Sequence, residues 1–320
     1  METNEYFISE KAKKRFKCQQ ILFGILKYGF LTICAIFMLI PFYYMIVTSL
    51  KTPELLKNEI IKGDFILFPK FKDLTLANYR IVIFGYGEKA KTFAEGNFLR
   101  YFANTLLVAI CSTAITVVTS VLSAFAFARL NFKGKNILFA LLLSTMMIPG
   151  EMMILTNYTT IMVLKWGNTY QALILTHAVS VFYIYYLRQT FQQIPNELYL
   201  AAKVDGYGVF KYLWKVMIPI AMPTIVTIII LSVMGSWNAY MWPTMITETD
   251  SMKMVANGLM DLFSSLDGGS TNTELLNKGY QYTDNLKLAG SFIVTLPLFI
   301  FFLCFRKYIM RGVSRSGIKG

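Results

Sequence analysis

The sequence predicts an all-α, polytopic membrane protein with six transmembrane helices. Hydrophobic residues make up 55% of the 320 residues and charged residues only 15%, whereas soluble globular domains contain about 25% charged residues. The apolar residues form runs long enough to cross the hydrocarbon core of a bilayer, which takes about 20 residues. The net charge is +13, but the Lys and Arg residues flank these runs. Flanking charge indicates membrane orientation, so we expect a lipid membrane around the chain and no nucleic acid as partner.

The predicted organisation begins with a cytoplasmic basic N-terminus, residues 1–20. The apolar run after it is too long for the core of a signal peptide, so we predict an uncleaved first span. The basic tail, residues 311–320, then also lies in the cytoplasm, and the chain is a multi-pass protein of the cell membrane. The transmembrane region is 21–310, and its spans are predicted at about 21–50, 102–127, 136–158, 170–187, 216–242 and 286–305.

Three of these spans have features that bear on function. The second span is rich in Ser, Thr and Ala, which is typical of helices packed against helices. Pro149-Gly150 interrupts the third span, and this break either borders a pathway or marks a helix that ends near Ile148 at the interface. His177 lies in the fourth span with no Asp or Glu clearly inside any span, which favours packing or hydrogen bonding over a proton relay.

Between the fourth and fifth spans, residues 194–215 are predicted to form a short helix, a tight turn and a second short helix. Pro195 fixes φ and ends the preceding span. Ala201 and Ala202 have small side chains, so another backbone can approach this part of the helix closely. Gly206 supplies the positive φ that commonly terminates a helix. This pattern predicts a docking element for a cytoplasmic partner.

The same loop carries a family resemblance. The run Ala201-Ala202-x-x-Asp205-Gly206, followed by Phe210 and Ile218-Pro219, resembles the "EAA" loop of ABC-importer permeases, and the flanking patterns resemble those of the carbohydrate (maltose/oligosaccharide-type) branch over nearly the whole chain. The resemblance implies a coupling helix that inserts into a groove on an ATPase subunit. The implied coupling residues are Glu197, Leu200, Ala201, Ala202, Asp205, Gly206 and Phe210.

One position departs from the family pattern. Leu200 stands where the motif has its glutamate, and Glu197 belongs to the flanking Pro-x-Glu-Leu pattern instead. The missing carboxylate removes whatever polar contact it makes with the ATPase, whereas the small residues, the Asp-Gly pair and the proline remain.

The resemblance also implies the partners. These are a second, homologous permease subunit, an ATPase subunit dimer, an extracytoplasmic solute-binding protein, and a sugar or short oligosaccharide as substrate. The chain contains no Gly-x-x-x-x-Gly-Lys phosphate loop and no histidine pair, so we expect no cofactor or metal in this chain and no enzymatic activity of its own. ATP and Mg are then bound by the partner ATPase.

The sequence identifies the translocation pathway less well. We predict Asn157, Trp237, Asn238 and Tyr240 as candidates. The aromatic residues at the end of the fifth span fit an interfacial belt and also a stacking surface for sugars. Two other functions remain open, namely an ATP-independent secondary carrier or channel, and a membrane assembly factor whose loop only recruits a partner.

Overall fold

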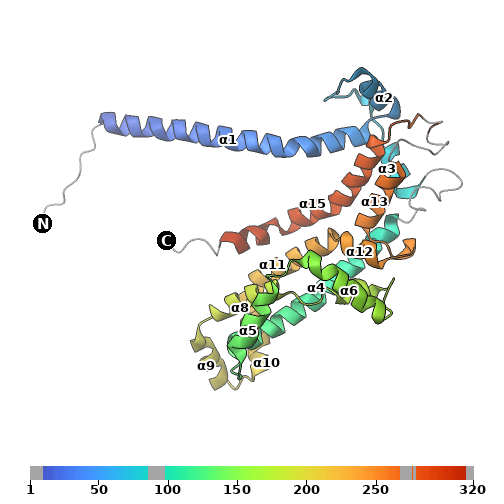
Figure 1. Cartoon of the computed structure of the whole chain (residues 1–320). Helices are drawn as coiled ribbons and strands as arrows, with labels where there is room; N and C mark the ends of the chain where they lie inside the picture. The colour runs from blue at the N-terminus through green and yellow to red at the C-terminus, as the bar shows by residue number, and fades with distance from the viewer. Residues whose placement is uncertain (1–9, 86–97, 267–275, 277–278, 315–320) are drawn as a thin grey trace.

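The computed structural model describes residues 10–85, 98–266, 276 and 279–314, and these residues are almost entirely helical (Figure 1). The glycine-containing part of the predicted external loop, 267–275, the first nine residues and the last six lie outside the described residues. The helices are α1 (Glu10–Leu50), α2 (Pro53–Lys62), α3 (Ala77–Phe84), α4 (Phe98–Arg129), α5 (Lys135–Thr145), α6 (Gly150–Val163), α7 (Tyr170–Leu175), α8 (Val181–Gln192), α9 (Asn196–Val204), α10 (Val209–Tyr212), α11 (Ile218–Trp237), α12 (Met241–Ile246), α13 (Val255–Leu266) and α15 (Asp284–Ser314).

Among the described residues, four helical segments are long and apolar enough to cross a membrane. They lie in α1, in α4, in the continuous run from α10 through α11, and in α15. A fifth crossing is possible through α5 and α6, which are bent by 97° at the break before Gly150. The Pro149-Gly150 break was expected either to border a pathway or to mark a helix that ends near Ile148 at the interface. The structure has an interruption here, since α5 ends at Thr145 and α6 leaves in a new direction, and both interpretations of its role stay predictions.

The predicted fourth span, 170–187, is not one helix. Helix α7 ends at Leu175 and α8 begins at Val181. The carbonyl groups freed in this break are satisfied from α4, because the hydroxyl of Thr116 donates to His177 O at 3.2 Å and that of Thr119 to Ala178 O at 2.9 Å. Irregular backbone is tolerated at membrane depth where neighbouring helices supply such partners.

The predicted fifth span, 216–242, is also interrupted. Helix α11 ends at Trp237 and α12 starts at Met241. At its other end the helix extends further than predicted, since the π-helical turn Leu213–Met217 joins α10 to α11. The element predicted as a separate second loop helix is therefore the first turn of a long one.

Helix α1 contacts the rest of the chain mainly near its C-terminal end, where it meets α15 (Figure 1). Only 6% of the residues in its most apolar stretch are buried. The ammonium of Lys51 is fully buried and lies 2.8 Å from both carboxylate oxygens of Glu59. The backbone oxygen of Lys51 accepts from the amides of Asn78 and Asn285. These contacts join α1, α2, α3 and the start of α15.

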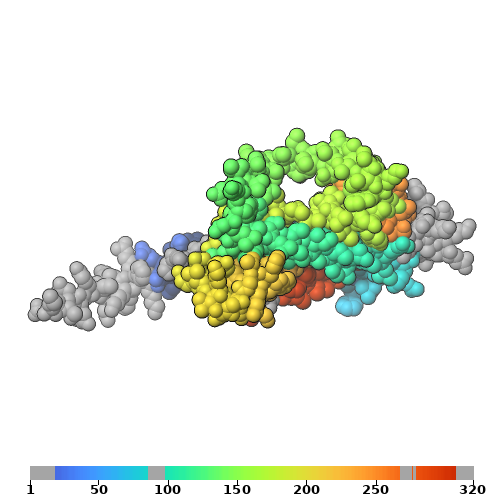
Figure 2. Space-filling model, turned by 90° about the horizontal axis from the view of Figure 1, so that it is seen from below, coloured from blue at the N-terminus to red at the C-terminus, as the bar shows by residue number. Residues whose placement is uncertain are grey.

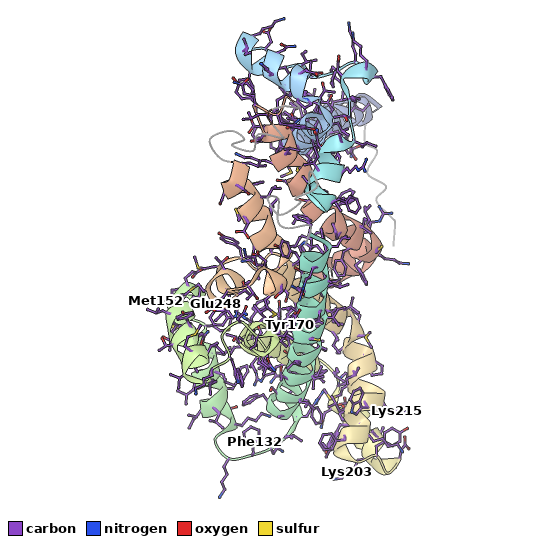
Figure 3. The ribbon with its side chains drawn as sticks, turned by 90° about the vertical axis from the view of Figure 1, so that its right-hand side faces the viewer. Phe132, Met152, Tyr170, Lys203, Lys215 and Glu248 are labelled. Carbon is purple, nitrogen blue, oxygen red and sulfur yellow. The ribbon has the colours of Figure 1, made fainter. Side chains whose placement is uncertain are left out.

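The remaining helices form one bundle, and the predicted 194–215 loop lies at one end of it. Lys203 of α9 and Phe132 lie at one end, and Glu248 and Tyr170 lie well away from it (Figure 3). The bundle is built on α4, which packs against both α8 and α11.

Candidate functional site

The docking element predicted at 194–215 is a helix closed by a tight turn. Helix α9 begins directly after Pro195 and ends at Val204. Gly206 has a φ of +74°. Its N–H donates to Lys203 O at 3.1 Å, and the N–H of Tyr207 donates to Ala202 O at 2.8 Å. This pair of bonds around a left-handed glycine is a Schellman motif, which reverses the chain into α10.

The inner side of this element is fixed to three longer helices. Ala202 and Tyr212 belong to one buried cluster with Phe125 of α4, Phe191 of α8 and Ala221 of α11. The ring of Tyr199 packs edge-on against that of Tyr212, with centroids 5.0 Å apart. These contacts attach α9 to α4, α8 and α11.

A cation strengthens the same junction. Arg129, the last residue of α4, donates from its guanidinium to the backbone oxygens of Phe191, at 3.0 Å, and of Ile194. These carbonyls lie at the C-terminal end of α8, where a positive charge interacts favourably with the helix dipole. Arg129 thereby holds the start of the docking element to α4.

The outer side projects from the bundle as a separate block, seen as the yellow residues in Figure 2. Leu200, Val204 and Phe210 are 55%, 88% and 69% exposed, and Glu197, Ala201 and Asp205 are also exposed. Ala202 is buried, so of the two alanines only Ala201 is on the surface. Neighbouring residues of a helix point in different directions. Of the two small side chains predicted to allow close approach, only one therefore lies on the surface.

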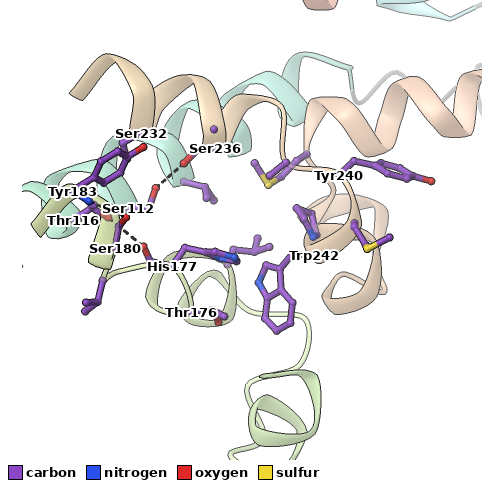
Figure 4. A pocket seen from close by; sticks show the side chains of 18 residues that line it. Ser112, Thr116, Thr176, His177, Ser180, Tyr183, Ser232, Ser236, Tyr240 and Trp242 are labelled. Atoms are coloured by element: carbon purple, nitrogen blue, oxygen red, sulfur yellow. Dashed lines mark hydrogen bonds between the residues drawn. The ribbon is translucent and has the colours of Figure 1, made fainter. Parts of the chain in front are cut away.

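The second site is a cavity of about 520 Å³, which is within the usual range for small-molecule sites. It lies beside the two helix breaks and is lined from α4, α7, α8, α11 and α12 (Figure 4). Its polar and aromatic lining residues are Ser112, Thr116, Thr176, His177, Ser180, Tyr183, Ser232, Ser236, Tyr240 and Trp242. No Asp, Glu, Lys or Arg is among the described residues that line it.

Hydrogen bonds hold several of these side chains in place. The hydroxyls of Ser112 and Ser236 are 3.0 Å apart and connect α4 to α11. The indole N–H of Trp242 donates to Ala172 O at 3.1 Å, and the ring of His177 packs edge-on against Trp242 with centroids 5.9 Å apart. The cavity thus offers hydroxyl groups and fixed aromatic surfaces without a net charge. Such walls suit an uncharged polar solute that also has apolar faces.

Of the four predicted pathway residues, one lines the cavity and three lie elsewhere. Tyr240 lines the cavity, whereas Trp237, Asn238 and Asn157 are not among its lining residues. Trp237 is buried against α15, where its indole N–H donates to Val294 O at 3.2 Å. The Asn238 amide donates to Met234 O within its own helix, and Asn157 is half-buried on α6. Their roles in a pathway stay predictions.

The serine and threonine residues of the cavity were not predicted as site residues. The hydroxyl-rich second span was expected to pack against other helices, and part of that span does pack. The available signal was that Ser112 and Thr116, four residues apart, share one helix face. Their facing partners come from α11 and from the interrupted segment after α7, which no local pattern reveals.

Comparison with known proteins identifies relatives over nearly the whole chain. The arabinooligosaccharides transport system permease protein AraQ of Halalkalibacterium halodurans is 30% identical over 309 residues, covering 95% of this chain and 99% of the relative. The polygalacturonan/rhamnogalacturonan transport system permease protein YtcP of Bacillus subtilis is 26% identical and covers 93% and 99%. The sn-glycerol-3-phosphate transport system permease protein UgpE of Brucella suis is 31% identical and covers 72% and 79%.

A solved structure shares the fold. A chain of a bacterial ABC transporter involved in the import of the acidic polysaccharide alginate superposes with a TM-score of 0.75 at 21% identity, covering 91% of this chain and 97% of the other. Residues 116–315 match the family described as binding-protein-dependent transport system inner membrane component. This match covers more than half of the chain, including the docking element and most of the cavity. The chain belongs to this family of inner membrane components of binding-protein-dependent transport systems.

Proposed function

We propose that the chain is a transmembrane subunit of an ATP-driven, binding-protein-dependent importer for a sugar or short oligosaccharide. The observation that carries the proposal is that α4 and α11 line the cavity and also anchor the α9–α10 docking element. A push or pull on the docking element therefore reaches the cavity walls through two continuous helices.

The proposed substrate class rests on the cavity and on the relatives. The names of two relatives specify transport of arabinooligosaccharides and of polygalacturonan or rhamnogalacturonan. The hydroxyl and aromatic side chains of the cavity match the two surfaces of a sugar, whose hydroxyls need hydrogen-bond partners and whose C–H faces pack on aromatic rings.

The coupling step is assigned to the outer face of α9 and α10. The family membership implies a partner ATPase dimer that binds ATP and Mg. In our proposal Leu200, Ala201, Asp205 and Phe210 contact a groove on that subunit, and Gly206 holds the turn between the two helices. Closure of the ATPase dimer then pulls this element and tips the spans from inward-facing to outward-facing. Each state is favoured only by the difference in affinity of nucleotide or solute for the two states.

The remaining components complete the pathway. A second, homologous permease supplies the other half of the membrane channel, and an extracytoplasmic binding protein delivers the solute. Both termini then lie in the cytoplasm, on the side of the docking element. Because Leu200 stands where the family motif has a glutamate, the docking surface of this chain is more apolar than that of a chain with the motif glutamate.

The experiment is reconstitution of the complete complex in proteoliposomes with a panel of saccharides and their binding protein. The proposal predicts that one saccharide raises ATP turnover and accumulates inside, and that accumulation stops when nucleotide is removed. Uptake that persists without nucleotide and collapses with the ion gradient would support a secondary carrier instead. Partner binding without any solute uptake would support an assembly factor.

A further inference from the structure

Three positive side chains gather at the C-terminal end of α4, where two candidate spans meet. Arg129 is the last residue of α4, Lys135 is the first of α5, and Arg188 lies on α8. The ammonium of Lys135 donates to Leu130 O at 2.9 Å. The guanidinium of Arg188 donates through Nε to Phe127 O at 3.2 Å. These two oxygens are three residues apart in the chain, so both cations are held beside the same end of α4.

We name Arg129, Lys135 and Arg188 the cationic cluster. The ammonium of Lys135 is close enough to both guanidinium groups to be repelled by them. Within the described part of the chain, no carboxylate forms an ion pair with any member of the cluster. The repulsion is therefore not offset by a negative side chain there.

The helix ends beside the cluster offset only part of its charge. The C-terminal end of a helix carries about −0.5 of an elementary charge. The cluster donates to carbonyl oxygens at the ends of α4 and of α8. Two such ends offset about one of the three positive charges, so the cluster keeps a clear excess of positive charge.

Lys135 and Arg188 also keep donors for a ligand. Both side chains are partly exposed. An ammonium has three N–H donors and a guanidinium has five, and each side chain uses one of them in the hydrogen bonds above. The guanidinium of Arg188 lies over the ring of Phe139, with Cζ 4.0 Å from the ring centroid. A guanidinium held by a ring still presents N–H groups to an anion, and phosphate matches their geometry.

An apolar surface on α5 adjoins the cluster. Leu138 follows Lys135 by three residues and Leu141 follows Leu138 by three, so the three side chains share one helix face. Leu138 and Leu141 are 49% and 59% exposed. Helices α5 and α6 together are apolar enough to form one broken span, so this face of α5 is suited to contact with acyl chains.

Basic residues at a membrane boundary can also orient a span without binding a particular lipid. That role does not require the charges to approach one another. Lys133 and Lys215, for example, are fully accessible on the surface. Lys135 and Arg188 are instead held together by hydrogen bonds to one helix end, in spite of their repulsion. This arrangement favours a defined anion site over a diffuse charge.

We propose that the cationic cluster binds the phosphate of an anionic phospholipid, with Lys135 and Arg188 donating to phosphate oxygens and an acyl chain lying on Leu138 and Leu141. Arg129 contributes attraction through its charge while it holds the end of α8. The lipid bridges α5 and α8 beside the attachment of the docking element to α4. This site is separate from the cavity, and the inference does not depend on the proposed transport function.

The test is photolabelling of the purified complete complex in a neutral detergent. The probe is phosphatidylglycerol with a photoreactive group in an acyl chain, and mass spectrometry of peptides measures the label on α5. Unlabelled phosphatidylglycerol, phosphatidylcholine and inorganic phosphate are added as competitors. Lys135→Gln removes the charge and keeps a donor for Leu130 O, and Lys135→Arg keeps the charge. Lys215→Gln is the matched control, since Lys215 lies far from Phe132 and the α4–α5 loop in Figure 3. Size-exclusion chromatography shows that each complex is intact.

We expect label on α5 that falls about fivefold in Lys135→Gln, the effect of one basic residue near an anionic lipid surface. Lys135→Arg keeps most of the label, and Lys215→Gln is labelled like the parent. Unlabelled phosphatidylglycerol competes, whereas phosphatidylcholine and inorganic phosphate do not.

Four results would each overturn the inference. Absence of label on α5 means that something other than this lipid covers the cluster in the complex. Equal competition by phosphatidylcholine means that the surface accepts any lipid, and displacement by inorganic phosphate means that it binds free phosphate. An equal loss of label in Lys215→Gln and Lys135→Gln means that the attraction is diffuse. None of these results bears on solute uptake, so the importer function stands or fails separately.

Discussion

The two ends of α4 and α11 are built in opposite ways. At the α9 end, buried residues from α4, α8, α9, α10 and α11 form one cluster, and a π-helical turn joins α10 to α11 without a gap. At the cavity end, the backbone is interrupted at 176–180 and at 238–240, and a space of about 520 Å³ lies beside the breaks. In the proposed function this difference is a division of labour, in which the continuous end transmits displacement and the interrupted end changes shape around a solute.

The largest expected effect concerns the turn of the continuous end. Gly206→Pro removes the N–H that donates to Lys203 O and cannot adopt a φ of +74°. We expect solute-stimulated ATP turnover of the assembled complex to be abolished while the spans still insert. Gly208→Ala is the matched control, since Gly208 has a φ of −72° and an added methyl meets no atom within 4 Å. Unchanged stimulation in Gly206→Pro would refute the docking role.

A filled cavity tests the interrupted end. Gly235 of α11 lines the cavity, and a Cβ added there meets nothing within 4 Å. Gly235→Leu should therefore place its side chain in the cavity and lower the uptake rate in proteoliposomes at least tenfold, whereas Gly235→Ala should have a much smaller effect. Normal uptake in the leucine variant would show that the solute does not use this space.

Arg129 tests the connection between the two ends, because it attaches the start of the docking element to α4. Arg129→Met removes charge-assisted hydrogen bonds to Phe191 and Ile194, each of the kind that contributes about 1.5–3 kcal/mol. We expect the free energy of unfolding in detergent, followed by circular dichroism, to fall by about 3 kcal/mol, the lower limit for two such bonds, together with weaker coupling. Lys133→Met, in the exposed loop after α4, should change neither. Full coupling in Arg129→Met would show that α9 does not need its tie to α4.

The smallest effect is expected at Lys253, outside the spans. Partial burial lowers the pKa of Lys253, but hydrogen bonds and charge interactions with Asp250 and Asp261 outweigh it, so the pKa lies above its ordinary value. Both carboxylates are about half exposed, so Lys253→Met should cost less than about 1 kcal/mol. Because the pKa of Lys253 is higher in the folded chain than in the unfolded chain, its ion pairs stabilise the fold fully at any pH below the unfolded pKa, about 10.4. This stabilisation is lost only as the pH rises through the folded pKa. The cost should therefore be equal at pH 7 and pH 9 in chemical unfolding; a cost that already falls between these two pH values would contradict this assignment.

The sequence predicted the elements whose chemistry is local. Pro195 and Gly206 bracket α9 because each residue restricts its own backbone, and the structure has the helix between them. The interruption at 176–180 was not predictable in this way, since the groups that stabilise it are Thr116 and Thr119 on a helix about 60 residues earlier. An apolar run of this length looks like one span until its neighbours are known.

The candidate sites show the same limit. Tyr240 was predicted from its aromatic surroundings and does line the cavity, whereas Trp237 has the same surroundings and is buried against α15. Which of two aromatic residues faces the cavity depends on where α11 ends, three residues earlier than Tyr240.

The most direct test of the central claim measures the cavity while the docking element is changed. Ser236→Cys, in a chain whose native cysteines are replaced by serine, reports access to the cavity through its rate of reaction with a water-soluble thiol reagent. We predict that trapping nucleotide in the complete complex changes this rate markedly in the parent, and that Gly206→Pro eliminates the change although the ATPase still binds nucleotide. If the rate responds to nucleotide equally in both complexes, the cavity is not driven through α9 and α10.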